Sequence, residues 1–253
     1  MMIWREEGAS GLFRRIVRKA KQAVYRGITS SYALYAHPHL PEKNSHRTCN
    51  GVVTSEKNRY LDSLVPFSTP TADYPGYKAG NVEAIQRHVE GGDTVVVVGG
   101  GSGVTAVAEG RAIGENGDLT VYEGSKLSID ELETTFSLNP VDCSRRSIHA
   151  IVGPEETVPG ADIDGAELVP VDDLPNCDVL ELDCEGAEEE ILRNLKITPR
   201  VIIVETHPYV GVSTDTIRAQ LEDSGYEIVD EFADASAGWI IPDGKVLVGH
   251  YDG

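Results

Sequence analysis

Apolar runs and amphipathic segments alternate along the chain after residue 80. Residues 94–98, TVVVV, form a continuous aliphatic run of the kind that a strand buried on both faces needs. Apolar runs of strand length follow at residues 118–123, 147–153, 178–183 and 200–206. Segments with helical spacing lie at residues 81–90, 103–112, 187–195 and 214–225, and a capping box starts another helix at residues 128–131. This order predicts an α/β domain with a Rossmann-like, doubly wound and mostly parallel sheet.

The last two apolar runs predict strands of another kind. Residues 226–232 and 245–251 have strand character and lie on either side of a Pro-Asp-Gly turn at residues 242–244. No helical segment is apparent between them. We therefore expect an antiparallel strand near the C-terminus.

The first 76 residues follow a different pattern. Residues 10–26, SGLFRRIVRKAKQAVYR, place apolar side chains on one helical face and Arg and Lys on the other. Such a basic amphipathic helix either attaches to an anionic membrane surface or an acidic partner, or packs its apolar stripe on the rest of the chain. Residues 37–76 are rich in Pro, Ser, Thr and Asn, which predicts an irregular cap or linker. We therefore expect an N-terminal extension, residues 1–74, and one α/β domain, residues 75–253.

Charge is distributed unevenly over the 253 residues. The chain has 41 acidic and 22 basic residues, and its net charge of -19 excludes a general nucleic-acid binder, because phosphate neutralisation needs a basic surface. Residues 1–26 hold seven basic and two acidic side chains, whereas residues 93–253 hold 33 acidic and nine basic ones. An acidic surface with only eight Lys is the composition expected in a salt-rich cytoplasm, such as that of a halophilic archaeon.

The sequence also predicts a cytoplasmic location. The four Cys form no CxxC pair, and a chain of this length needs no disulfides to fold. No signal peptide is apparent, and the longest aliphatic run, residues 95–98, is far shorter than the roughly 20 apolar residues of a membrane span. Peripheral contact with the inner face of a membrane, through residues 10–26, is compatible with this location.

The strand at residues 94–98 runs directly into a glycine-rich turn. Gly99, Gly101 and Gly103 let the backbone turn tightly and set the N-terminus of the next helix against a ligand. A dinucleotide fingerprint, G-x-G-x-x-G, would place its last glycine at Val104. The observed G-x-G-x-G spacing is instead associated with the adenosyl cofactor of class I methyltransferases. Glu123 ends the next strand, where a carboxylate can accept both hydroxyls of a ribose.

Polar side chains gather at the ends of two later strands. Asp183 and Glu185 follow one strand, and Glu205 and His207 follow the next. The carboxyl ends of parallel strands share one edge of the sheet, so these groups are expected beside the glycine turn. His207 suits removal of a hydroxyl proton because its unperturbed pKa of roughly 6.5 lies near working pH, and Asp183 is the alternative base. The carboxylates alternatively hold a divalent cation. Glu188, in the first turn of a helix, is expected in solvent.

Three stretches of the chain resemble one family. Residues 171–174, VDDL, residues 182–188, LDCEGAE, and residues 205–208, ETHP, are similar to the FkbM-type family of S-adenosylmethionine-dependent methyltransferases. The resemblance implies a class I methyltransferase fold and, usually, O-methylation of a sugar or another small hydroxyl-bearing molecule. Two positions depart from the family. Where this chain has Val97, the family commonly has an acidic residue that contacts the cofactor. Where this chain has Glu181, the family commonly has Lys. The second departure either changes how the substrate is held or is a surface exchange typical of a halophile.

We therefore expect an S-adenosylmethionine-dependent O-methyltransferase that acts on a glycan or another small molecule. The expected cofactor-binding residues are Gly99, Gly101, Gly103, Glu123 and Glu185, and the expected catalytic residues are Asp183, Glu205 and His207. Two alternatives remain. An NAD(P)-dependent oxidoreductase is disfavoured by the glycine spacing and by the family resemblance. A non-catalytic methyltransferase-like binding module has its best support in Val97.

Overall fold

The computed structural model describes residues 42–59, 74–153, 163, 165–233 and 244–251. Its strands are β1 (Glu42–Cys49), β2 (Val52–Arg59), β3 (Thr94–Val98), β4 (Asp118–Glu123), β5 (Ser144–Val152), β6 (Glu167–Val169), β7 (Val179–Leu182), β8 (Val201–Glu205), β9 (Tyr226–Ala233) and β10 (Lys245–Tyr251). Its helices are α2 (Ala79–His88), α3 (Val104–Ile113), α4 (Lys126–Leu138), α5 (Glu188–Asn194) and α6 (Thr214–Asp223), with short 3-10 turns η4 (Gly114–Asn116), η6 (Val171–Asp173) and η7 (Pro208–Val210).

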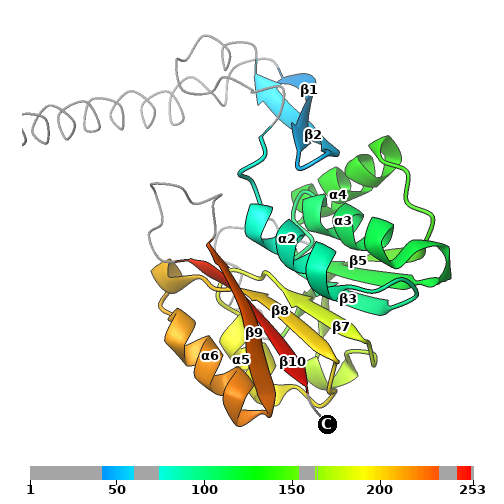
Figure 1. Cartoon of the computed structure of the whole chain (residues 1–253). Coiled ribbons are helices and arrows are strands. Elements are labelled where there is room, and N and C mark those ends of the chain that lie inside the picture. Colours follow the sequence, from blue (N-terminus) through cyan, green and yellow to red (C-terminus); the bar gives the residue numbers. More distant parts are fainter. Residues whose placement is uncertain (1–41, 60–73, 154–162, 164, 234–243, 252–253) are drawn as a thin grey trace, which may run out of the picture. The chain divides into compact units, whose positions relative to one another are not determined.

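Eight of these strands form one sheet, in the order β6-β5-β4-β3-β7-β8-β10-β9. Figure 1 shows β3, β7 and β8 in the central part of this sheet. β3 pairs in parallel with β4 on one side and with β7 on the other, and the order of the strands along the sheet reverses there. β10 is antiparallel to both β8 and β9. The predicted mostly parallel, doubly wound sheet with an antiparallel strand near the C-terminus is confirmed. An open α/β sheet binds its ligands beside such a reversal, at the carboxyl ends of the strands.

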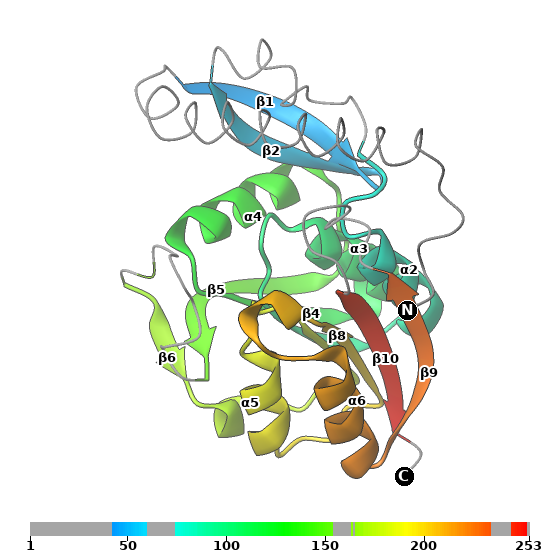
Figure 2. The same ribbon diagram turned by 90° about the vertical axis from the view of Figure 1, so that its left-hand side faces the viewer.

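β3 is apolar throughout because both faces of the sheet are covered. Val95 and Val97 pack in a buried cluster with side chains of α2, α3 and α4. Val96 and Val98 point to the other face and pack with side chains of α5 and α6. Figure 2 shows α5 and α6 side by side, in agreement with their contacts. Packing against helices on both faces therefore fixes the position of the sheet and of the carboxyl ends of its strands.

The expectation of an irregular cap or linker over residues 37–76 is wrong for its central part. β1 and β2 pair in a two-stranded sheet, and Asn50 and Gly51 join them with φ values of 49° and 79°. An Asn-Gly pair favours this hairpin turn because both residues tolerate positive φ. The polar composition of the flanking residues predicts an irregular segment, whereas the Asn-Gly pair predicts the hairpin that the structure shows.

Several element boundaries also differ from the expectation. α4 begins at Lys126 rather than at residue 128, and Ser125 is its N-cap, accepting a hydrogen bond from the backbone N–H of Ser128. β5 begins at Ser144 rather than at residue 147. Its first residues are exposed and polar, so the apolar pattern does not indicate that they belong to the strand. The short strand β6 was not expected. The helix expected at residues 10–26 lies outside the described residues. None of the described helices is long and apolar enough to cross a membrane.

Candidate active site

A pocket lies at the carboxyl ends of β3, β4, β5 and β7. Its empty volume is about 490 Å³, part of which is open to solvent. Gly99, Glu123, Asp183 and Glu185, four of the residues expected at the site, line it. Apolar side chains at the ends of β4 and β5 line another part, including Tyr122, Ile151 and Val152. The parallel topology therefore brings four expected site residues, at intervals of up to 60 positions in the sequence, to one pocket.

The three expected glycines have different roles in the turn. A Cβ on Gly99 would lie 1.9 Å from the carbonyl oxygen of Asp183, so this glycine permits the close approach of β3 and β7. A Cβ on Gly103 would lie 2.8 Å from Leu132 of α4. Gly101 has a φ of 49°, and a Cβ there would meet nothing within 4 Å. Two glycines thus serve packing, and Gly101 leaves open space at the turn.

Glu123 ties the glycine turn to the end of β4. Its Oε2 accepts a hydrogen bond of 2.7 Å from the backbone N–H of Gly101, and its Oε1 accepts one of 2.7 Å from Ser125. Burial raises the pKa of Glu123, and the two backbone hydrogen bonds offset part of this effect. Each carboxylate oxygen has a second lone pair for a hydroxyl group. The arrangement fits a ligand with neighbouring hydroxyls, such as a ribose.

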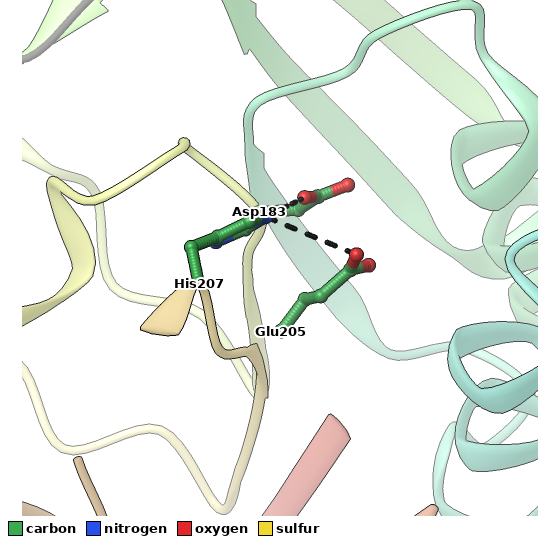
Figure 3. A group of neighbouring side chains, drawn as sticks. All are labelled: Asp183, Glu205 and His207. Atoms are coloured by element: carbon green, nitrogen blue, oxygen red, sulfur yellow. Dashed lines mark ion pairs between the residues drawn. The ribbon is translucent and has the colours of Figure 1, made fainter. Parts of the chain in front are cut away.

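Asp183 belongs both to the pocket and to a buried cluster of charges (Figure 3). His207 Nε2 lies 3.5 Å from Asp183 Oδ1 and 3.8 Å from Glu205 Oε1. Glu205 ends β8 and His207 follows it, so the neighbouring strands β7 and β8 bring the three side chains together. The sequence prediction that these residues lie close together is confirmed. Glu185 stands at the rim, with its side chain 59% exposed and 4.0 Å from His207 Nε2.

Lys78 completes this cluster, and the sequence reasoning did not find it. Its Nζ donates hydrogen bonds of 2.6 Å to Asp183 Oδ2 and 2.7 Å to Glu205 Oε2. Burial alone would lower the pKa of Lys78, but Asp183 and Glu205 raise it well above its usual value. A single Lys that precedes a helix carries no pattern in the sequence. Only the fold, which places the start of α2 over the ends of β7 and β8, identifies it.

Glu188 is buried rather than solvated, so the sequence expectation for this residue is wrong. Its carboxylate accepts hydrogen bonds from the backbone N–H groups of Cys184 and Gly186, at 2.9 and 2.8 Å. Its Oε1 also lies 2.8 Å from His207 Nδ1. The helix dipole favours an acid at this position, as expected, but η7 and the loop after β7 enclose it. Glu188 therefore orients the imidazole of His207 toward Asp183.

The protonation states follow from these contacts. Burial would lower the pKa of His207, but its hydrogen bonds to Asp183 and Glu188 raise it to about 10. Burial would raise the pKa of Asp183, but Lys78 and His207 lower it to about 2. At neutral pH, His207 is therefore a cation and Asp183 an anion. The pKa near neutrality on which the argument for a histidine base rested is not the pKa in the folded protein.

Glu181 is fully buried, which contradicts the interpretation of this residue as a surface exchange. Its side chain interacts with Glu109 of α3, which is also fully buried, and Asn81 Nδ2 donates a hydrogen bond of 3.2 Å to its Oε1. Burial, followed by Asp183, raises the pKa of Glu181 to about 7. Burial, followed by Glu181, raises the pKa of Glu109 well above its usual value. Glu181 lies beside Val97 in the sheet, on the face that α2 and α3 cover.

A divalent cation fits this site poorly. One ligand atom each from Asp183, Glu205 and His207 lie within 4.8 Å of one another, which resembles a metal-ligand set. The ammonium of Lys78, however, already bonds both carboxylates. His207 is protonated at neutral pH, and a protonated imidazole has no lone pair for a metal. The charge that a metal would supply is therefore present in the side chains.

Comparisons with known proteins agree with this architecture. Residues 84–228 match the family model of the methyltransferase FkbM domain. TYW2 of Pyrococcus horikoshii, solved in complex with MeSAdo, has a TM-score of 0.52 and 13% identity, over 84% of this chain and 73% of that chain. A transferase of the same organism has a TM-score of 0.52 and 13% identity, over 83% of this chain and 73% of that chain. A search of curated proteins found no match. At these identities, the solved structures show the fold alone.

Proposed function

The chain belongs to the FkbM methyltransferase family, and on that premise we propose that it transfers the methyl group of S-adenosylmethionine to a hydroxyl of a saccharide or another small molecule. One observation carries the proposal. Asp183 lines the pocket that contains Glu123 and the glycine turn, and it also belongs to the buried cluster with Lys78 and His207. A cofactor pocket and a group able to accept a proton thus meet at one side chain.

The pocket fits S-adenosylmethionine by its donor set and its shape. Glu123 accepts the ribose hydroxyls, and the open space at Gly101 admits the cofactor to the turn. The apolar wall at Ile151 and Val152 suits the adenine ring, and Glu185 at the rim suits the amino group of the methionine part. When bound, the cofactor supplies a methyl group on a positively charged sulfur, which is a strong electrophile.

The buried cluster positions the acceptor and receives its proton. We assign this role to Asp183, because a protonated His207 has no lone pair to accept it. Asp183 would accept the hydroxyl proton as the acceptor oxygen takes the methyl group, and the cofactor would leave as a neutral thioether with the electron pair of its broken C–S bond. A carboxylate with a pKa of about 2 is basic enough, because the hydroxyl becomes strongly acidic as the bond to carbon forms. Glu205 and His207 hold the geometry in which transfer occurs.

The charges of the cluster support a neutral acceptor. Within the part of the chain that the structure describes, Asp183, Glu188 and Glu205 pair with Lys78 and His207, and Glu185 adds a further negative charge at the rim. A phosphate or carboxylate next to the reacting hydroxyl would be repelled here. A polyhydroxylated compound such as a saccharide would instead donate hydrogen bonds to the carboxylates.

Equilibrium binding of S-adenosylmethionine and NADH, measured by calorimetry, tests the cofactor. We expect saturable binding of S-adenosylmethionine that Glu123→Ala weakens by at least about tenfold, since a hydrogen bond to a charged group contributes about 1.5–3 kcal/mol. Glu227→Ala, on the exposed surface of β9, is the matched control and leaves binding unchanged. Binding of NADH without binding of S-adenosylmethionine would instead support the oxidoreductase alternative.

Transfer is tested with the cofactor labelled on its methyl group and a panel of neutral saccharides, acidic sugars and amines. We expect the label, followed by mass spectrometry, to appear on hydroxyl groups of the neutral saccharides. Cofactor binding without transfer to any acceptor would favour the non-catalytic binding module, and label on nitrogen would contradict O-methylation.

A further inference from the structure

Lys78 is a cation held between two carboxylates at the reactive end of the sheet. Its side chain is 16% exposed, and those of Asp183 and Glu205 are 10% and 5% exposed. Two carboxylates this close and this buried repel each other unless a positive charge lies between them. The ammonium supplies that charge through two short hydrogen bonds. The ammonium therefore acts on Asp183, which receives the proton in the proposed transfer, and on Glu205, which helps to hold its geometry.

The backbone also indicates that this position is specialised. Lys78 is the N-cap of α2 and has a φ of 54°, a left-handed conformation that is unfavourable for a side chain with a Cβ. Among the described residues, Asn50, Lys78 and Glu185 are the non-glycine residues with positive φ. Asn50 lies in the hairpin turn, whereas Lys78 and Glu185 both border the cluster. Strain of this kind persists where the surrounding structure compensates for it, and it concentrates at functional sites.

The same side chains would form a cation site without the ammonium. Asp183 and Glu205 offer two carboxylate oxygens, and His207 offers a nitrogen once its proton is displaced, all within 4.8 Å of one another. Carboxylate and imidazole groups are ligand types that divalent metals accept. The ammonium of Lys78 also occupies the space between the carboxylates and repels an approaching cation, so loss of Lys78 removes an obstacle to metal binding. A neutral residue at position 78 would therefore remove the ammonium that bonds both buried carboxylates.

We propose that Lys78 takes the place of a divalent cation in this site, bridging Asp183 and Glu205 and keeping them correctly spaced so that methyl transfer needs no metal. Lys78 is a positioning residue, because it acts through Asp183 and Glu205 rather than on the methyl group. The inference rests on the methyltransferase function proposed above. It also predicts that substitution of Lys78 converts the cluster into a metal site.

Titration with Mn²⁺, followed by electron paramagnetic resonance, tests this conversion without any activity measurement. We expect Lys78→Gln to bind one Mn²⁺ per chain at least ten times more tightly than the unchanged protein. The control Lys126→Gln removes an exposed Lys of α4 and should bind Mn²⁺ as the unchanged protein does, which corrects for the acidic surface. Adding Asp183→Asn to Lys78→Gln should abolish the new binding. Equal Mn²⁺ binding by Lys78→Gln and the unchanged protein would overturn the proposal.

Kinetics of the unchanged enzyme and of Lys78→Gln supply the second test. We expect EDTA to leave the activity of the unchanged enzyme intact. Lys78→Gln should lose at least tenfold in kcat with little change in the KM for the cofactor. Lys78→Arg should restore part of the activity.

These outcomes separate the two proposals. Inhibition of the unchanged enzyme by EDTA, with recovery on addition of Mn²⁺ or Mg²⁺, would refute the role of Lys78 even if Lys78→Gln failed to fold. Absence of cofactor binding would refute the methyltransferase function, and the Mn²⁺ titration would still decide whether Lys78 occupies a cation site.

Discussion

The buried pair of Glu109 and Glu181 should make the stability of the domain fall as pH rises toward 7. Both side chains have no measurable exposure, and both oxygens of Glu109 and Oε2 of Glu181 lack a hydrogen-bond donor in the structure. Glu109 also faces Cys143, while Asn81, Thr105, Lys78 and Asp183 surround Glu181. Two carboxylates in contact cannot both ionise without a large cost, so the pair keeps a proton.

The magnitude follows from the pKa of Glu181, which is raised from 4.5 to about 7. An acid with a raised pKa in the folded state contributes its full stability below the pKa of the unfolded chain, and that stability is lost as pH rises through the folded pKa. Here the loss begins near pH 4.5 and is complete above about pH 7. At about 1.4 kcal/mol per unit, it amounts to about 3 kcal/mol, of which about 2 kcal/mol falls between roughly pH 5.5 and 8.5.

Glu181→Gln keeps the shape of the side chain and removes its charge. Chemical denaturation at about pH 5.5, 7 and 8.5, at one fixed salt concentration, measures the free energy of unfolding of both proteins. The free energy of unfolding of the variant, relative to that of the unchanged protein, should increase by about 2 kcal/mol across this range. Glu133→Gln, on the exposed face of α4, is the control and should show no such trend. If the stabilities of Glu181→Gln and the unchanged protein ran parallel over the whole range, Glu181 would be ionised in the folded protein and the reasoning would be refuted.

Three further predictions concern the site and the N-terminal segment. Glu188→Gln should lower the pKa of His207 from about 10 toward neutrality, because the Glu188 carboxylate bonds the His207 imidazole. NMR of the imidazole measures this pKa, and Glu190→Gln in the same helix is the control. An unmoved pKa would show that Glu188 does not hold the proton. Gly99→Ala should destabilise the domain by about 3 kcal/mol or more, because its Cβ would overlap the carbonyl of Asp183, whereas Gly101→Ala should cost about 1 kcal/mol and act mainly on cofactor binding; equal losses in thermal unfolding would contradict this. We also propose that residues 1–26 contact an anionic membrane surface, so their removal should lower co-sedimentation with anionic vesicles at low ionic strength, and an unchanged partition would exclude the contact.

The sequence by itself determined the type and order of the main elements from α2 onward, apart from the short strand β6. Residues 94–98 are apolar at every position because β3 is covered on both faces, and the alternation of runs and helical segments defined the parallel order. Parallel order in turn places Glu123, Asp183 and Glu205 at one edge. These conclusions depend on periods of two and 3.6 residues, which are local properties of the chain. The hairpin of β1 and β2 was also accessible, because Asn50-Gly51 is a local signal.

Only the tertiary structure decided which charges are buried and which partners they have. The sequence interpretation left Glu188 and Glu181 at the surface, yet both have no measurable exposure. Lys78 lies 105 residues before Asp183, and the packing of α2 over the sheet alone brings them together. Burial and long-range pairing also set the pKa of His207, so its charge was beyond local reasoning. Local periodicity specifies elements, whereas the chemistry of a buried side chain depends on the whole fold.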